Sequence, residues 1–241
     1  MYKHMSLDLK GKKVLITGSS DGLGKALAVE LSKLGAKIIV HGRNEEKVDK
    51  VLNELEGDGH SKIICDFNNP EDIDTKFSGI KELDILVNNT GVWSEGNTLD
   101  ISTDKIREMI SVNTTSYLLV SRMLLPVLLK SEFAQILNTI SVAGYEIPAG
   151  FYHTTYTATK YALQGYTEGM AKEFENRNLR VMGYYPGGMN TELFKKAGLD
   201  YKVNEPWMFD VMESVEAIIF MLTRNKKISI KRMDLINHLQ E

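Results

Sequence analysis

Tyr156 and Lys160 are the two residues whose types and spacing most directly suggest chemistry. They stand four residues apart at the start of a helical stretch, so they share one helix face. A lysine ammonium beside a phenol favours the phenolate and lowers the pKa of the tyrosine. Moving that pKa from about 10 to about 7 takes roughly 4 kcal/mol. A tyrosine tuned in this way can pass a proton to or from a carbinol oxygen. Taken alone, the pair is also compatible with an ordinary amphipathic helix in which Tyr156 and Lys160 are neighbours by chance.

A glycine-rich stretch over residues 17–24 is the second motif with a chemical meaning. It follows the apolar run 13–16, which predicts a buried strand, and leads into leucines at helical spacing. A strand, a glycine turn and a helix together aim backbone N–H groups and a positive helix end at an anion. Glycine also lets the backbone approach a pyrophosphate closely. The alternative is a tight turn without a ligand, although three glycines in seven residues exceed what a turn needs.

The remaining chain supplies the elements that must position these residues. Further strands are predicted at 37–40, 63–65, 83–87, 135–140, 179–185 and 228–230, and helices after Asn44 and Asn69 and at about 102–130, 155–176 and 214–222. Strands that are apolar throughout and alternate with helices predict a parallel sheet covered on both faces. We therefore expect an α/β fold: one Rossmann-like domain over residues 1–241, with a doubly wound parallel sheet of about seven strands.

Polar clusters follow the carboxyl ends of the predicted strands. They are residues 17–24, Arg43, Asp66, residues 88–91, Ser141 and residues 186–191. Ligands of such sheets collect outside these strand ends, so one crevice is expected to hold all the clusters.

An ordered set of motifs then resembles the short-chain dehydrogenase/reductase family over roughly residues 10–195. The set is Thr17-Gly18-x3-Gly22-x-Gly24, Asn88-Asn89-Thr90-Gly91, Asn113, Ser141, Tyr156-x3-Lys160 and Pro186-Gly187. The resemblance implies that Ser141 orients the substrate oxygen and that Tyr156 is the general acid/base. Lys160 would bind the nicotinamide ribose and lower the tyrosine pKa, and Asn113 would support a water-linked proton relay. Thr90 departs from the usual alanine, and Ser141 and Tyr156 are further apart than usual.

The resemblance also implies a nicotinamide dinucleotide, with Asp66 at the adenine, Asn89 at the adenosine ribose and Thr191 at the carboxamide or pyrophosphate. The expected cofactor-binding residues are Gly18, Ser20, Asp21, Gly22, Leu23, Gly24, Arg43, Asp66, Phe67, Asn89, Gly91, Tyr156, Lys160, Pro186, Gly187, Met189 and Thr191.

The end of the second predicted strand favours NADP(H), while NAD(H) stays possible. NAD-preferring folds place there an acid that accepts hydrogen bonds from the ribose 2′-OH. This chain has Gly42 followed by Arg43, whose guanidinium matches a 2′-phosphate, and Ser20 could add a hydroxyl donor. Glu45 and Glu46 are interpreted as first-turn charges of the next helix. Alternatively, Arg43 covers a helix end on the surface.

The function these features predict is an NADP(H)-dependent oxidoreductase that interconverts a ketone or aldehyde and an alcohol. A non-catalytic NADP(H)-binding sensor and a protein scaffold are the alternatives; neither needs Ser141, Tyr156 and Lys160 together. Specificity is expected from residues 92–95, 145–147, 152–153 and a lid over 193–209, where Phe194, Trp207, Met208 and Phe209 suggest an apolar lining. His153 is interpreted as a polar surface residue.

Composition narrows the partners to small molecules. A net charge of −3 gives no reason to expect nucleic acid or a membrane, and the basic cluster at residues 224–232 is interpreted as a solvated edge.

A single cysteine, Cys65, and the lack of a visible signal peptide favour a cytoplasmic protein. No His/Cys/Asp cluster has metal-ligand spacing. The resemblance implies a homodimer or homotetramer that pairs through the two long helices.

Overall fold

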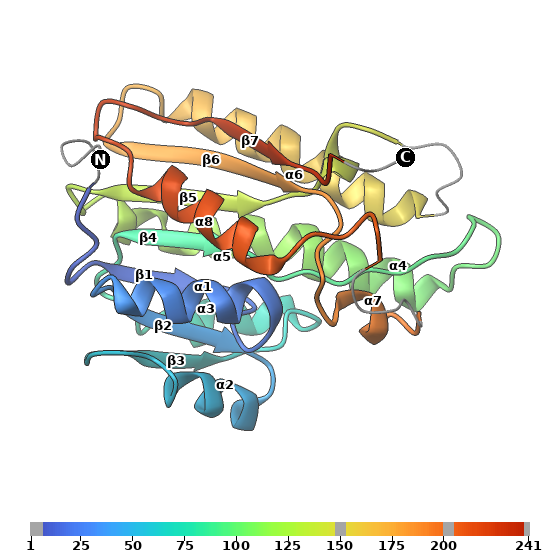
Figure 1. The fold of residues 1–241 in the computed structure, drawn as a ribbon, viewed down its shortest axis with the longest axis horizontal. Coiled ribbons are helices and arrows are strands. Elements are labelled where there is room, and N and C mark those ends of the chain that lie inside the picture. The colour runs from blue at the N-terminus through green and yellow to red at the C-terminus, as the bar shows by residue number, and fades with distance from the viewer. Residues whose placement is uncertain (1–6, 148–152, 200–204, 239–241) are drawn as a thin grey trace.

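Seven parallel strands in the order β3-β2-β1-β4-β5-β6-β7 form the centre of the computed structural model, which describes residues 7–147, 153–199 and 205–238 (Figure 1). The strands are β1 (Lys13–Ile16), β2 (Lys37–Gly42), β3 (Ser61–Ile64), β4 (Ile85–Asn88), β5 (Ala134–Thr139), β6 (Leu179–Pro186) and β7 (Arg232–Leu235). The strand order reverses between β1 and β4, which is where doubly wound sheets open a crevice for ligands. The predicted Rossmann-like parallel sheet is confirmed.

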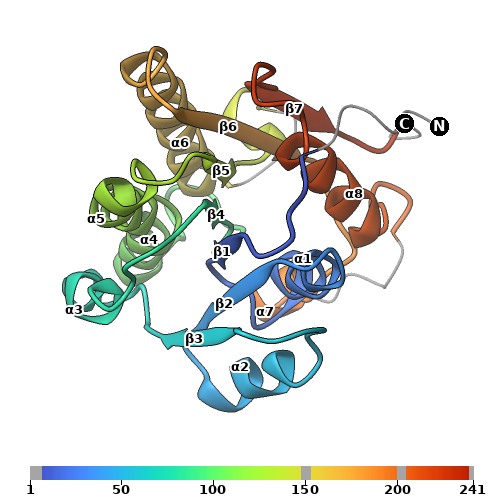
Figure 2. The same ribbon diagram turned by 90° about the vertical axis from the view of Figure 1, so that its left-hand side faces the viewer.

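Helices cover both faces of this sheet (Figure 2). One face carries α1 (Gly22–Lys33), α2 (Glu45–Leu52) and α8 (Val211–Leu222). The other carries α3 (Ile73–Phe77), α4 (Thr103–Ile110), α5 (Ser116–Leu128) and α6 (Thr154–Glu173). Each face has its own buried apolar layer, in which Leu27 and Ile218 lie on the first side and Phe77 and Leu124 on the second. The strands between them are apolar throughout because both of their faces are covered.

Side-chain caps fix where the helices around the crevice begin. Asp21 precedes α1, and its carboxylate accepts a hydrogen bond from the Gly22 N–H at 2.7 Å. Asn44 precedes α2 and accepts from the Lys47 N–H at 2.9 Å, as its sequence position predicts. Asn69 precedes the short 3₁₀ turn Pro70–Asp72, but its side chain makes no capping hydrogen bond.

The last strand differs from the sequence prediction. Ile228, Ser229 and Ile230 have the better strand propensity, yet β7 is Arg232–Leu235. The carbonyl oxygen of Ile228 accepts a hydrogen bond from the Arg180 guanidinium at 2.8 Å. This segment therefore binds the Arg180 side chain instead of pairing as a strand. Pairing with β6 starts only where the Gly183 N–H meets the Lys231 carbonyl oxygen at 2.9 Å. Tertiary contacts therefore override local propensity here.

The long helix predicted over residues 102–130 is interrupted by a π-helical turn. This turn, η2 (Ser111–Thr115), separates α4 from α5 and contains the buried Asn113. Single π-helical turns are often found at functional sites, because the extra residue reorients the side chains of one turn.

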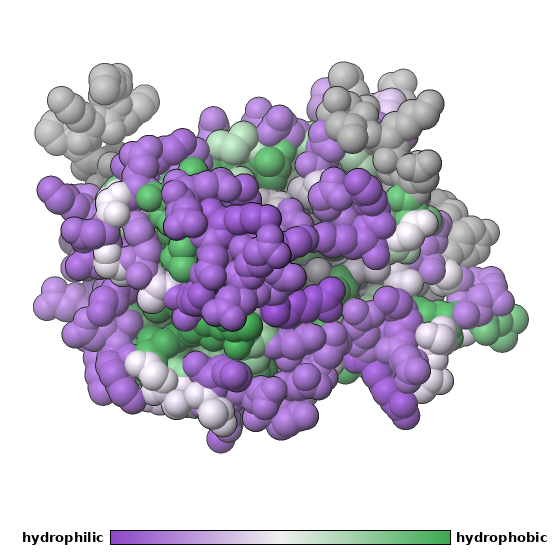
Figure 3. Space-filling model, turned by 90° about the horizontal axis from the view of Figure 1, so that it is seen from below, coloured by the Kyte–Doolittle hydropathy of each residue, from purple (hydrophilic) through white to green (hydrophobic). Residues whose placement is uncertain are grey.

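The sheet ends at β3 with polar residues. Seen from below, hydrophilic side chains predominate on the face around β3 and α2, with apolar patches between them (Figure 3). Lys62 of β3 pairs with Glu45 at 2.8 Å and Asp49 at 2.6 Å, which discourages another strand from joining this edge. Among the described residues, no helix has the length and apolarity that crossing a membrane requires.

Candidate functional site

A cavity of about 720 Å³ lies at the carboxyl ends of the central strands. It is lined by most of the residues that the sequence singled out: Gly18, Ser20, Asp21, Gly22, Leu23, Arg43, Asp66, Phe67, Asn89, Gly91, Ser141, Tyr156, Lys160, Pro186, Gly187, Met189 and Thr191. Gly24 and Asn113 are the two expected site residues that do not line it. The polar clusters at the strand ends therefore do share one crevice.

The glycine loop is held by contacts that leave no space for side chains. A Cβ on Gly24 would lie 2.4 Å from the Gly18 carbonyl oxygen and 2.6 Å from the Asn89 amide nitrogen. Gly18 has a φ of +65°, and a Cβ there would lie 2.9 Å from the Cα of Thr90. The loop needs glycine for its conformation at Gly18 and for close backbone approach at Gly24. Such a cradle suits a pyrophosphate, which a bare backbone can approach.

Gly42 and Arg43 form the wall beside this loop. A Cβ on Gly42 would lie 2.8 Å from the Ser20 hydroxyl oxygen and 2.9 Å from a Val48 methyl group, so a side chain at this position would have to displace both. Arg43 is exposed and lines the cavity. The two nearby acids are engaged elsewhere: Glu45 pairs with Lys62, and Glu46 pairs with Lys50 at 2.8 Å. The interpretation of both glutamates as surface charges of α2 is confirmed.

His41 is a component of the cavity that the sequence analysis missed. Its ring is 2% exposed, stacks on Phe67 at 4.4 Å between centroids, and accepts a hydrogen bond from the Gly18 N–H at Nδ1, at 3.0 Å. Burial lowers the pKa of His41 to about 4, so the imidazole is neutral and able to accept at neutral pH. The sequence did offer a signal for His41: it is a polar residue at the carboxyl end of an apolar strand, like the other polar clusters that predicted the site.

Tyr156 and Lys160 lie side by side from the first turns of α6, both almost completely buried. The Lys160 ammonium lies 5.5 Å from the centre of the Tyr156 ring and donates to the Thr139 carbonyl oxygen at 3.3 Å. Burial raises the pKa of Tyr156 to about 12, partly offset by a hydrogen bond with Ser141, and burial lowers the pKa of Lys160 to about 7. The lowered tyrosine pKa expected from the sequence is wrong, because burial of the phenol raises its pKa.

Ser141, two residues beyond the end of β5, has a rare backbone conformation, with φ 156° and ψ 158°. This region is almost restricted to glycine, and residues held in it cluster at functional sites. Asn113 lies behind the cavity wall. Its side chain accepts from the Val92 N–H and donates to the Val92 carbonyl oxygen, both at 2.8 Å, and so ties the π-helical turn to the loop after β4.

The cavity beyond Tyr156 is lined by the expected Val92, Trp93, Phe194 and Trp207. It is not lined by Ser94, Glu95, residues 145–147, Met208 or Phe209. His153 is 6% exposed rather than on the surface, because its ring packs edge-on against Trp93 and Tyr156 and its Nδ1 lies 2.9 Å from the Thr157 hydroxyl. Tyr145 does not line the cavity; it packs against Tyr185 under the Arg232 guanidinium. Tyr152 and residues 200–204 of the expected lid lie outside the described residues.

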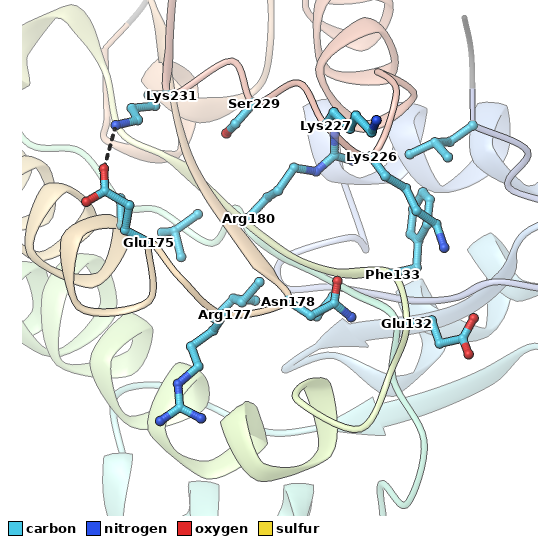
Figure 4. Close-up of a pocket in the computed structure, with 15 residues that line it drawn as sticks. Glu132, Phe133, Glu175, Arg177, Asn178, Arg180, Lys226, Lys227, Ser229 and Lys231 are labelled. Atoms are coloured by element: carbon cyan, nitrogen blue, oxygen red, sulfur yellow. Dashed lines mark ion pairs between the residues drawn. The ribbon is translucent and has the colours of Figure 1, made fainter.

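A second cavity, of about 220 Å³, lies at the opposite ends of β5 and β6. Arg180 projects into it and donates to the carbonyl oxygens of Leu222, Arg224 and Ile228 (Figure 4). Glu175 pairs with Lys231 at 3.7 Å across its rim. These contacts fasten the segment after α8 to the sheet, which gives Arg180 and Lys231 a structural explanation.

The comparisons with known proteins assign the family. The family model for short chain dehydrogenases matches residues 12–202, and the chain belongs to this family. It is 28% identical to an uncharacterized oxidoreductase of Staphylococcus aureus strain USA300, over 93% of this chain and 96% of that protein. It is 30% identical to a 3-oxoacyl-[acyl-carrier-protein] reductase of Rickettsia bellii, over 81% of this chain and 80% of that one.

Solved structures agree with this assignment. A short chain dehydrogenase of Escherichia coli CFT073, solved in complex with NADPH, superposes with a TM-score of 0.83 at 25% identity, over 94% of this chain and 98% of that one. The protein is therefore an oxidoreductase of the short chain dehydrogenase family.

The buried His41 predicts a pH-dependent stability. Its pKa is about 4 in the folded protein and about 6.5 when unfolded, so between these values the unfolded chain binds more protons. The free energy of unfolding should fall by roughly 2 kcal/mol from this residue alone between about pH 7 and pH 5. Urea unfolding at both pH values measures the loss. His41→Gln retains an acceptor for the Gly18 N–H but does not titrate, and its loss should be smaller by that amount. Equal losses in the two proteins would contradict the assignment.

Proposed function

We propose that this protein is an NADP(H)-dependent oxidoreductase that interconverts a ketone or aldehyde and an alcohol by hydride transfer. The observation that carries the proposal is that Ser141, Tyr156 and Lys160 line the same cavity as the glycine cradle and Arg43. A dinucleotide bound along the cradle would supply or accept the hydride. The chain supplies the binding, the orientation and the proton.

The residues present fit such a dinucleotide. The backbone around Gly18 and Gly24 leaves space at the start of α1 for a pyrophosphate, whose charge the helix end favours. Asp66, Phe67 and Asn89 line the wall that would receive the adenosine half. Arg43 would bind the 2′-phosphate, because its guanidinium matches a phosphate and the position before it holds glycine rather than an acid. The relative solved with NADPH supports the same cofactor.

Tyr156 would act on the substrate oxygen as acid or base, and Ser141 would orient that oxygen. With a pKa raised to about 12, Tyr156 keeps its proton at neutral pH. The protonated phenol is the form that donates to a carbonyl oxygen, so neutral pH favours reduction of the carbonyl, whereas oxidation of the alcohol needs the phenolate. The positive charge of a bound oxidised nicotinamide would lower the pKa from this starting point.

A non-catalytic sensor remains the second candidate, since the cradle and Arg43 would serve it equally well. It leaves unexplained why a hydroxyl, a phenol and an ammonium converge at the other half of the cavity.

The proposed oligomer rests on the family resemblance and on the partly exposed apolar residues Ile110, Leu118, Leu129 and Tyr161 along α4, α5 and α6.

Tyr156→Phe removes the transferable proton and little else. Turnover with NADPH and a carbonyl substrate should fall at least 100-fold, while the dissociation constant for NADPH should change less than about twofold. Tyr161→Phe, five positions further along α6 and 42% exposed, is the matched control and should behave as wild type. More than a tenth of the wild-type rate in Tyr156→Phe would remove Tyr156 as the acid/base, and turnover in no carbonyl assay would favour the sensor.

Arg43→Leu should weaken NADPH binding without weakening NADH binding. A charge-assisted bidentate contact contributes roughly 1.5–3 kcal/mol, which corresponds to a loss of about 10- to 150-fold in affinity. Isothermal titration with both cofactors measures the effect. Lys47→Leu removes the next cation along the chain, which does not line the cavity, and should leave both affinities unchanged. Equal wild-type affinities for NADPH and NADH, or an unaffected Arg43→Leu, would assign Arg43 to the surface.

Lys196 predicts a control on cofactor release. It lies on α7 (Leu193–Lys196) and pairs with Asp21 of the glycine loop across the cavity mouth, with half of the lysine side chain exposed. Exposed pairs contribute up to about 1 kcal/mol, so Lys196→Gln should speed NADPH release by up to roughly fivefold. Stopped-flow displacement of NADPH by excess NADP⁺ measures the rate. Lys195→Gln breaks only the neighbouring pair with Glu192, and equal rates in the two variants would contradict the prediction.

A further inference from the structure

Beyond the glycine cradle, the cavity is bounded by a continuous series of aromatic rings. Tyr156 contacts His153 at 5.8 Å between centroids, and His153 contacts Trp93 at 6.1 Å. Trp93 contacts Phe194, and Phe194 contacts Trp207, each at 5.2 Å. All four contacts are edge-to-face, with interplanar angles from 64° to 83°. We call His153, Trp93, Phe194 and Trp207 the aromatic wall.

The aromatic wall begins at the catalytic candidate and has a fixed far end. Trp207 packs directly on Gly188, where a Cβ would lie 2.1 Å from the indole ring. Trp93 and His153 are 8% and 6% exposed, so the inner part of the wall is held by the protein core. Rings fixed in this way keep their orientation when a ligand enters, which reduces the entropic cost of binding.

The wall carries no positive charge for an acidic substrate group. Burial lowers the pKa of His153, so this imidazole is neutral at neutral pH. Arg43 lies at the end of β2, beside the glycine loop, and Lys196 pairs with Asp21 of that loop. Glu192 is the charged residue next to Leu193 and Phe194 in the cavity lining, and it would repel a carboxylate.

From these observations we propose that the site accepts uncharged carbonyl compounds with an aromatic ring, which packs against the aromatic wall while the carbonyl oxygen faces Ser141 and Tyr156. The proposal rests on the oxidoreductase function proposed above and specifies its substrate class. A flat ring gains edge-to-face contacts that a saturated ring of similar size cannot make. A carboxylate packed against the wall would lose its hydration without gaining a cation from the described wall residues.

The chain contains a direct reporter for this site. It has two tryptophans, Trp93 and Trp207, and both belong to the aromatic wall. A ligand that packs against the wall should therefore change the intrinsic tryptophan fluorescence of the full-length protein, whether or not it is turned over.

The experiment compares 4-phenylbutan-2-one, 4-cyclohexylbutan-2-one and 2-oxo-4-phenylbutanoate. In all three, two methylene groups separate the ring from the carbonyl, so the ring does not change carbonyl reactivity directly. With NADPH present, kcat/KM should favour the phenyl ketone over the cyclohexyl ketone by roughly 2- to 10-fold. With NADP⁺ present instead, the dissociation constants of the two ketones, measured by tryptophan fluorescence, should show the same preference. The carboxylate should be the poorest ligand.

Phe194→Leu retains both tryptophans and an apolar side chain but removes the central ring of the wall. The preference for phenyl over cyclohexyl should fall toward unity, with little change for the cyclohexyl ketone. Phe220→Leu, which changes a half-exposed ring on α8 outside the cavity, should retain the preference.

Two patterns of results separate this inference from the proposed function. Turnover of the ketones with no phenyl preference, or with the preference unchanged in Phe194→Leu, overturns the aromatic site and leaves the oxidoreductase proposal standing. Selective quenching by the phenyl ketone without any NADPH oxidation supports the aromatic site and overturns the proposed turnover. Equal or better binding of the carboxylate overturns the requirement for an uncharged ligand.

Discussion

The close contact between the backbone of the glycine loop and the start of α1 is the constraint on which the site depends. With Gly24 against the Gly18 carbonyl oxygen, a Cβ at position 24 has no space between the end of β1 and the first turn of the helix. Asn89 crosses the same space and donates to the carbonyl oxygens of Thr17 and Gly18 at 3.2 and 3.4 Å, while the Thr17 hydroxyl accepts from the Asn89 N–H. The loops after β1 and β4 are therefore fastened together at the point where the strand order reverses.

Burial governs the electrostatics of three residues that line the cavity. His41, Tyr156 and Lys160 are all removed from water, and each pKa is shifted toward the neutral form. Their polar atoms are held by the chain itself, through the Gly18 N–H, the Ser141 hydroxyl and the Thr139 carbonyl oxygen respectively. Three charged residues lie near the glycine loop: Arg43 and Lys196 are exposed, and Asp21 is half-buried. At the aromatic end of the cavity, the exposed Glu192 lies two positions before Phe194.

Local sequence patterns predicted those parts of the structure that local physics decides. The buried strands, the cap at Asn44 and the convergence of polar residues at the strand ends follow from periodicity, capping and the geometry of parallel sheets. The errors occurred where distant residues decide. The last strand begins at Arg232 rather than at Ile228 because Arg180 binds the Ile228 carbonyl oxygen. His153 is a buried wall residue rather than a surface residue because Trp93 and Thr157 surround it. The pKa of Tyr156 was misjudged because the spacing of two residues carries no information about their exposure to water.

The short helix α7 connects the two ends of the cavity. Phe194 and Lys196 are two residues apart on it: the phenylalanine ring packs between Trp93 and Trp207, and the lysine pairs with Asp21 in front of α1. A helix this short has little stability of its own, so its position is set by these two contacts. An ion pair at the surface is weak and is screened by salt, whereas the ring contacts are partly buried. Any displacement of α7 changes the aromatic wall and the mouth of the glycine cradle together, because the same backbone carries a residue of each.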